Sequence, residues 1–193
     1  MIHYRGYGSR EAYLAHQRGK DAVHSGLIEY SEKLMAALVE RYCHCVKYGE
    51  SMLCLGARIG AEVEAFQKMG LFAVGIDINP GDKNPYVLFG DFSCPIFGNG
   101  TIQNIYTNSL DHVFDLEPHL NQIKQQLVPN GHFFLDLVNG TEQGYSPGAF
   151  EACWWDHTDD VINLLKERFE IVSREPIEIP WPGESIVMRN HEN

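Results

Sequence analysis

The sequence has 193 residues, of which 44% are hydrophobic and 21% are charged. A chain of this length and composition can bury a sizeable apolar core, so we expect one globular unit rather than a disordered chain. It carries 15 Lys and Arg against 26 Asp and Glu, a formal net charge of −11. This acidic balance, without any basic run, argues against nucleic-acid binding and against attachment to an anionic membrane.

The five cysteines predict free thiols, because their number is odd and their spacing fits no disulfide framework. Free thiols are typical of a reducing compartment, so we expect a cytoplasmic protein. The Cys43-His44-Cys45 segment lacks a second ligand pair, and no metal site is predicted. No apolar stretch resembles a signal peptide or a membrane-spanning segment.

The first part of the sequence predicts a lead-in followed by alternating helices and strands. Residues 1–24 show weak periodicity and predict an extended segment with a short helix near Glu11–Arg18. Apolar residues at helical spacing predict a longer helix over residues 26–46. Short apolar runs predict strands at residues 52–55, 71–76 and 86–89, with a helix at residues 62–69 between the first two. We therefore separate an N-terminal helical lead-in, residues 1–48, from a domain at residues 49–193.

The second part continues the alternation. Strands are predicted at residues 102–107, 132–138, 169–174 and 185–189, and helices over residues 116–127 and 158–168. Pro129-Asn130-Gly131 is expected to break the chain before its strand, and residues 140–157 form a loop rich in Gly, Pro and aromatic residues.

Strand–helix alternation predicts parallel strands joined by crossover helices. The last two strands have no room for a helix between them, so they are expected to be antiparallel. The predicted fold is α/β: a Rossmann-like, doubly wound, mostly parallel sheet of seven strands with an antiparallel C-terminal strand and helices on both faces.

Ligands of such sheets bind beyond the carboxyl ends of the strands. Gly56 and Gly60 lie in the first of these loops, where they allow a tight turn next to a helix N-terminus; a plain connecting turn is the alternative. Asp77 follows the next strand, 21 residues after Gly56, the usual place for a carboxylate that accepts from ribose hydroxyls. A turn-forming Asp is the alternative. Together, the two loops predict an adenosine-containing cofactor without specifying which one.

Two further loops carry polar residues after predicted strands. Asp91 can accept a hydrogen bond from the amino group of adenine, and Phe92 can cover a ring face. The next loop holds Asn108-Ser109-Leu110-Asp111-His112.

In this order, the motifs of residues 50–190 resemble the class I S-adenosylmethionine-dependent methyltransferases. The matching segments are Met52 to Gly60, Val74 to Asp77, Gly90 to Phe92, Asn108 to His112 and Leu127 to Gly131. Three positions depart from the family pattern. Cys54 replaces an acidic residue that helps to bind the methionine end of the cofactor, and Arg58 and Asn130 replace glycines. Asn tolerates a positive φ, so Asn130 is expected to cost little.

The resemblance implies S-adenosylmethionine as the cofactor and assigns roles to residues. Those near its methionine part would be Gly56, Ala57 and Gly60, with Asn108 and Ser109 under the sulfonium. Those near its nucleoside would be Asp77 at the ribose, Ile78 and Phe92 at the adenine, and Asp91 at the adenine amino group. Arg58 could pair with the carboxylate of the cofactor, or it could point elsewhere. Polar N-terminal residues could close over the methionine part: Tyr13, His16, Gln17 and Lys20.

The resemblance also implies in-line transfer of a methyl group. His112, with Asp111, is a candidate base for an acceptor that must lose a proton, although both could merely orient the following helix. The Asn-Pro-Pro-Tyr/Phe motif of base and Gln methylation is absent, which with the acidic charge favours a small-molecule acceptor. A protein acceptor is the alternative. Trp154 and Trp155 could line its pocket or pack against the sheet.

Two other functions stay open. Cys54 and Arg58 leave room for a protein that binds the cofactor without catalysis. An NAD-dependent oxidoreductase is less consistent with the sequence, because G-x-G-x-x-G is absent at residues 56–61. The oligomeric state is open, with a homodimer among the options.

Overall fold

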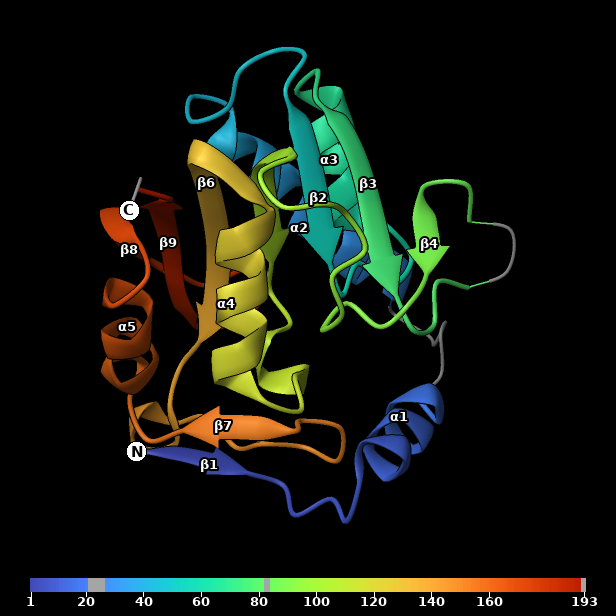
Figure 1. The fold of residues 1–193 in the computed structure, drawn as a ribbon, viewed down its shortest axis with the longest axis vertical. Helices are drawn as coiled ribbons and strands as arrows, with labels where there is room; N and C mark the ends of the chain where they lie inside the picture. Colours follow the sequence, from blue (N-terminus) through green and yellow to red (C-terminus); the bar gives the residue numbers. More distant parts are fainter. Residues whose placement is uncertain (21–26, 82–83, 192–193) are drawn as a thin grey trace.

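A computed structural model describes residues 1–20, 27–81 and 84–191. Its centre is a seven-stranded sheet with the order β4-β3-β2-β5-β6-β9-β8 (Figure 1). The strands are β2 (Ser51–Leu55), β3 (Phe72–Asp77), β4 (Val87–Phe89), β5 (Ile102–Thr107), β6 (Leu127–Val138), β8 (Glu170–Ile177) and β9 (Gly183–Arg189). Neighbours from β4 to β6 pair in parallel, whereas β9 is antiparallel to both β6 and β8. The predicted fold class is confirmed.

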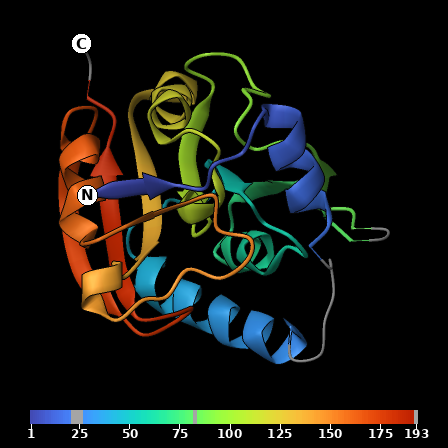
Figure 2. The same ribbon diagram turned by 90° about the horizontal axis from the view of Figure 1, so that it is seen from below.

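Helices cover both faces of this sheet (Figure 2). The helices α2 (Leu27–Tyr42) and α3 (Ala61–Lys68) lie on one face, and α4 (Leu116–Gln126) and α5 (Thr158–Lys166) lie on the other. Side chains along β2 alternate between the two layers. Met52 and Cys54 join the core under α2 and α3, while Leu53 and Leu55 join the core under α4 and α5. The continuous apolar run in the sequence therefore reflects a strand that is buried on both faces.

The strand β6 corrects one expectation. It begins at Leu127, directly after α4, so Pro129-Asn130-Gly131 lies inside the strand and does not break the chain. Backbone hydrogen bonds continue there, because the Asn130 N–H donates to the Asn190 carbonyl and the Asn190 N–H donates to the Gly131 carbonyl, both at 2.8 Å. Asn130 adopts φ 61°, which asparagine tolerates better than most residues.

A second, two-stranded antiparallel sheet was not predicted. The strand β1 (Ile2–Tyr4) pairs with β7 (Cys153–Trp155). Trp155 is buried, and its Nε1 donates to the Val138 carbonyl at 3.0 Å, so this tryptophan packs in the core. Neither Ile2–Tyr4 nor Cys153–Trp155 shows a pattern that predicts a strand from the sequence.

The N-terminal segment then leads to α1 (Arg10–Arg18), which lies below the carboxyl ends of the parallel strands in Figure 1. Asn79, in the loop after β3, holds the end of this helix. Its Nδ2 lies 3.2, 3.2 and 2.9 Å from the carbonyl oxygens of Gln17, Arg18 and Lys20. The Gln17 side chain donates in turn to the Phe150 carbonyl at 2.6 Å. As a result, α1 is fixed across the edge of the sheet where ligands of such folds bind.

The remaining elements are two short 3₁₀ helices, η1 (Leu110–His112) and η2 (Thr141–Gln143). The helix α2 contributes Leu34 and Leu38 to the same core as α3, and the predicted boundary between residues 48 and 49 stays a prediction. None of the helices within the described ranges is long and apolar enough to cross a membrane.

Candidate functional site

A cavity of about 310 Å³ opens at the carboxyl ends of β2, β3 and β5. Nine of the predicted site residues line it: Gly56, Ala57, Arg58, Asp77, Ile78, Phe92, Asn108, Ser109 and His112. Gln17 and Lys20 from the N-terminal segment line it as well. The lining does not include the predicted residues Gly60, Asp91 and Asp111.

Gly56 makes the closest contact between the loops after β2 and β5. Its φ is +73°, and a Cβ there would lie 2.7 Å from the Ser109 Cβ, so only glycine fits without a shift. Gly60 has φ +92° and precedes α3, where it shapes the turn without facing the cavity. Arg58, at the position where the resembled family has glycine, also has a positive φ of 44°.

The Asp77 carboxylate is held by backbone donors. The Arg58 N–H donates to its Oδ2 at 2.9 Å, and the Asn79 N–H donates to its Oδ1 at 2.7 Å. Each carboxylate oxygen has a second lone pair, so both can still accept from a ligand. Asp77 is 9% exposed and lines the cavity. It is therefore a fixed pair of acceptors, the arrangement that a vicinal diol requires.

Asp91 is engaged elsewhere. Its Oδ1 accepts from the Ser93 N–H and hydroxyl at 2.9 and 2.6 Å, and its Oδ2 pairs with Arg10 of α1 at 2.6 Å. Burial opposes ionisation, but these contacts outweigh it and hold the pKa of Asp91 below its usual value. The predicted contact between Asp91 and adenine stays a prediction, whereas Phe92 does reach the cavity.

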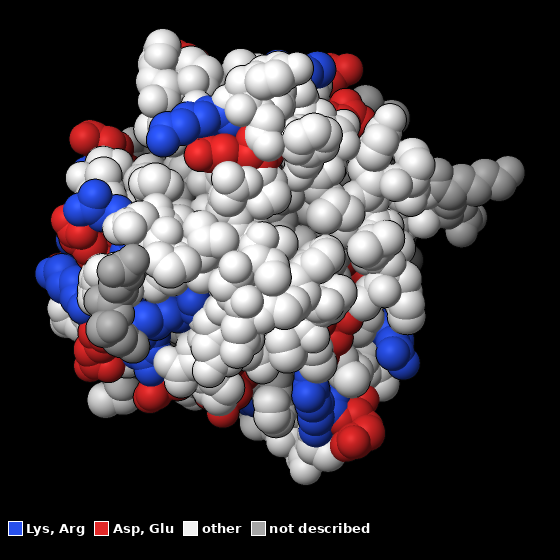
Figure 3. All heavy atoms as spheres, turned by 45° about the horizontal axis from the view of Figure 1, so that its top comes forward, with Lys and Arg blue, Asp and Glu red and all other residues white. Residues whose placement is uncertain are grey.

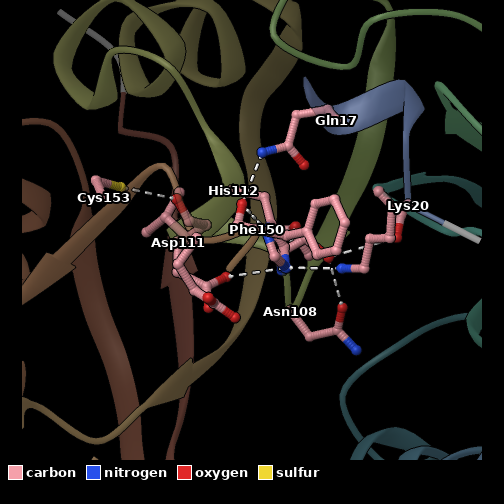
Figure 4. A network of polar contacts seen from close by, with 12 residues as sticks. Gln17, Lys20, Asn108, Asp111, His112, Phe150 and Cys153 are labelled. Atoms are coloured by element: carbon pink, nitrogen blue, oxygen red, sulfur yellow. Dashed lines mark hydrogen bonds and ion pairs between the residues drawn. The ribbon is translucent and has the colours of Figure 1, made fainter. Parts of the chain in front are cut away.

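His112 sits among charged and polar groups (Figure 4). Its Nδ1 lies 3.0 Å from the Phe150 carbonyl oxygen, which requires the proton on Nδ1 and leaves a lone pair on Nε2. The Lys20 Nζ lies 3.2 Å from that Nε2 and donates to it. The Asp111 Oδ1 lies 3.9 Å from the same Nε2, and burial raises the pKa of this carboxyl group. Burial has the opposite effect on Lys20, whose pKa it lowers.

One group of described residues has the composition of a metal site. Ligand atoms of Asp111, His112 and Glu151 lie within 4.8 Å of one another. A metal ion would need the Nε2 lone pair, to which the Lys20 ammonium already donates. In this structure the Lys20 ammonium therefore supplies the positive charge next to the carboxylates of Asp111 and Glu151.

The lining residues that the sequence analysis missed include Tyr30, Glu62 and Trp181. Glu62, in the first turn of α3, is 6% exposed. The Asn108 Nδ2 donates to its Oε1 at 3.3 Å, and burial raises the pKa of Glu62 to about 8. The buried Nε1 of Trp181 has no hydrogen-bond partner among the described residues.

These residues carried little sequence signal. Glu62 stands two positions after Gly60 like any acidic residue in a first helical turn, and Trp181 lies in a proline-rich connection. Trp154 and Trp155, by contrast, do not line the cavity, so the expectation that favours packing over an acceptor pocket describes them better. Cys54 also points away, into the core shared with α3.

Comparisons with known proteins support the fold. No protein-family model matches the sequence, and no curated protein matches it significantly. Among solved structures, the chain is similar to the 1,6-didemethyltoxoflavin-N1-methyltransferase of Burkholderia thailandensis, solved with 1,6-didemethyltoxoflavin and S-adenosylhomocysteine. The TM-score is 0.73 at 15% identity, over 99% of this chain and 95% of that one.

Two other similar structures agree. A chain from the complex of the Haloferax volcanii Trm112 methyltransferase activator gives a TM-score of 0.67 at 15% identity, over 94% of this chain and 97% of that one. A SAM-dependent methyltransferase from Aquifex aeolicus gives 0.64 at 14% identity, over 86% and 94%. The fold is that of the class I S-adenosylmethionine-dependent methyltransferases.

Proposed function

We propose that this chain binds S-adenosylmethionine in the cavity and transfers its methyl group to a small-molecule acceptor. The proposal rests on the functional groups that lie side by side at the carboxyl edge of the sheet. Asp77, a diol-accepting carboxylate, ends β3; a glycine turn at Gly56 follows β2; and the polar Asn108 and Ser109 follow β5. All four line one cavity in a fold that methyltransferases use.

The lining suits the parts of this ligand. Asp77 would accept from the two ribose hydroxyls, and Ile78 and Phe92 would contact the adenine faces. Gly56 and Ala57 would let the ligand approach the backbone closely. The guanidinium of Arg58 matches the ligand carboxylate as a fork.

S-adenosylmethionine supplies a methyl group on a positively charged sulfur, and the protein has to place the acceptor in line with it. Effective placement brings the reacting atoms to about 3–3.5 Å. Gln17 of α1 lines the same cavity and would limit the access of water to it. His112 would take the acceptor proton on Nε2 once the Lys20 ammonium moves from it. Asp111, whose Oδ1 lies 3.9 Å from that Nε2, would stabilise the imidazolium.

Two observations support a small acceptor. Tyr30, Leu34 and Trp181 add apolar surface to the lining of the cavity, and the buried Trp181 Nε1 can donate one hydrogen bond. The face drawn in Figure 3, which includes the amino ends of the parallel strands, shows basic and acidic side chains interspersed around an uncharged centre, with no basic patch on that face. The Burkholderia methyltransferase binds a small molecule beside S-adenosylhomocysteine, which agrees with this choice. We also propose a cytoplasmic location, because the cysteines are free.

Calorimetry tests which cofactor the chain binds. We expect S-adenosylmethionine and S-adenosylhomocysteine each to bind at one site and NAD not to bind. Incubation of the S-adenosylmethionine complex with a panel of flat hydroxyl and amine compounds, followed by mass spectrometry, should then detect a methylated product. Binding of NAD without binding of S-adenosylhomocysteine would overturn the proposal. Binding without product across a broad panel would favour the non-catalytic alternative.

A further inference from the structure

Glu62 is a buried carboxyl group without a counter-charge. It lines the cavity and accepts a hydrogen bond from Asn108, but it forms no ion pair with any residue in the described ranges. An isolated carboxylate is costly to bury, so such a group holds a proton instead. This is the reason that the pKa of Glu62 rises to about 8.

The groups that face Glu62 from each neighbouring element are neutral or acidic. Cys54 lies on β2, and burial together with the nearby Glu62 raises the pKa of its thiol. Tyr30 lies on α2, and burial and the Glu62 carboxyl also raise the pKa of its hydroxyl. Asp77 on β3 and Asp136 on β6 both oppose ionisation of Glu62.

The nearby cations form no ion pair with Glu62 among the described residues. The Lys20 ammonium, which lines the same cavity, donates to the His112 Nε2 at 3.2 Å. The Arg41 guanidinium pairs with Asp136 at 2.6 Å. Arg58 lines the same cavity, but its backbone is held at Asp77, and its side chain makes no ion pair with Glu62 among the described contacts. A positive charge that satisfies Glu62 would therefore come from a ligand.

We propose that Glu62 binds the α-ammonium group of the cofactor's amino-acid tail. The inference rests on the proposed function. With the ribose at Asp77, the last residue of β3, the tail would extend past Gly56 toward Asn108 after β5, which is where the Glu62 carboxyl lies. Of the two cationic groups of S-adenosylmethionine, only the ammonium has N–H donors, and an ammonium–carboxylate hydrogen bond is charge-assisted.

Binding should then be coupled to the release of a proton. With a pKa of about 8, Glu62 is protonated in about 0.9 of the free molecules at pH 7. The arriving ammonium ionises the carboxyl, so the complex should release about 0.9 proton per ligand bound. Calorimetry in buffers of different ionisation enthalpy measures this number.

The test compares two ligands that differ in the tail. S-adenosylhomocysteine carries the amino-acid tail, whereas 5′-methylthioadenosine lacks it. We expect Glu62→Gln to lower the affinity for S-adenosylhomocysteine about 10- to 100-fold and to change the affinity for 5′-methylthioadenosine by no more than about twofold. The variant should also release no proton on binding. Glu64→Gln, which changes an exposed residue on the same helix, is the control and should match the unchanged protein.

The possible results are distinguishable. If the unchanged protein binds neither ligand, the proposed function fails and this inference fails with it. If both ligands bind, but Glu62→Gln weakens them equally or weakens neither, the cofactor site stands and the role of Glu62 is wrong. Binding of 5′-methylthioadenosine by Glu62→Gln also shows that the variant is folded.

Discussion

Asp77 illustrates how a single side chain can be prepared for a ligand by the backbone around it. Its two oxygens accept from the N–H groups of Arg58 and Asn79, so no rotation is needed before a diol binds. Asp77→Asn replaces one acceptor with an amino group that faces an N–H donor. We expect about 1–3 kcal/mol weaker binding of both S-adenosylhomocysteine and 5′-methylthioadenosine, because both carry the ribose. Calorimetry that shows a loss for only one of them would contradict the ribose role.

Gly56 makes a prediction about stability. Gly56→Ala adds a Cβ 2.7 Å from the Ser109 Cβ and places alanine at φ +73°. We expect a loss of about 2–4 kcal/mol in the free energy of unfolding from overpacking and backbone strain together. Gly100→Ala is the matched control, since φ there is +62° with nothing within 4 Å of the added Cβ, and it should cost only about 1–2 kcal/mol. Equal losses in urea unfolding would show that the Ser109 contact does not matter.

At this scale the sequence identified residues whose role depends on position along the chain. Gly56 and Asp77 could be predicted from the sequence, because a glycine turn and a carboxylate at the ends of successive strands have a recognisable spacing. Glu62 could not be predicted, because its importance comes from the burial of its carboxyl group without a neighbouring positive charge. That environment depends on side chains of four other elements. Nor could sequence show that Asp91 pairs with Arg10, a contact across 81 positions.

The helices and most strands were predicted close to their observed bounds, whereas the start of β6 and the two strands β1 and β7 were not. The helix expected near Glu11–Arg18 is α1 (Arg10–Arg18), and the helix expected over residues 26–46 is α2 within its described range. By contrast, β1 and β7 have three residues each and depend on pairing between segments 150 positions apart. Local pattern fails where a tertiary contact decides the structure.

The contact between Asn79 and the end of α1 leads to a prediction about the stability of that helix. Asn79→Ala removes the side-chain donor to three carbonyl oxygens at the end of this helix and leaves the Asn79 N–H on Asp77. We expect faster amide exchange across residues 10–18 and faster dissociation of S-adenosylhomocysteine, because local opening becomes easier. Asn99→Ala, in an exposed loop, is the control. Unchanged exchange in α1 would mean that Tyr13 and Arg10 hold the helix without Asn79.

For the whole molecule, the alternation of strands and helices was sufficient to predict the sheet and its antiparallel end. Met52 to Leu55 illustrates why, because a strand covered on both faces has to be apolar throughout. The location of the cavity followed from this topology, since parallel strands end at one edge. The position of α1 beside the cavity did not follow from the topology, because it depends on hydrogen bonds such as that from Asn79 to Lys20.

The buried Glu62 should also affect the stability of the whole molecule. Its pKa is raised from 4.5 to about 8 on folding, so between these values the folded chain holds a proton that the unfolded chain lacks. The resulting stabilisation is complete below about pH 4.5 and is lost as pH rises through about 8. His119, whose pKa burial lowers to about 4, acts in the opposite direction only below about pH 6.5, so the two effects separate.

We therefore expect the ligand-free protein to lose about 1.5 kcal/mol of unfolding free energy between pH 6.5 and 8 through Glu62 alone. Urea unfolding of the unchanged protein and of Glu62→Gln at both pH values isolates this contribution, because every other titrating group is common to the two. The difference between the proteins should shift by that amount in favour of Glu62→Gln at the higher pH. If the difference is the same at both values, Glu62 is ionised in the ligand-free fold, and proton release on binding should be absent as well.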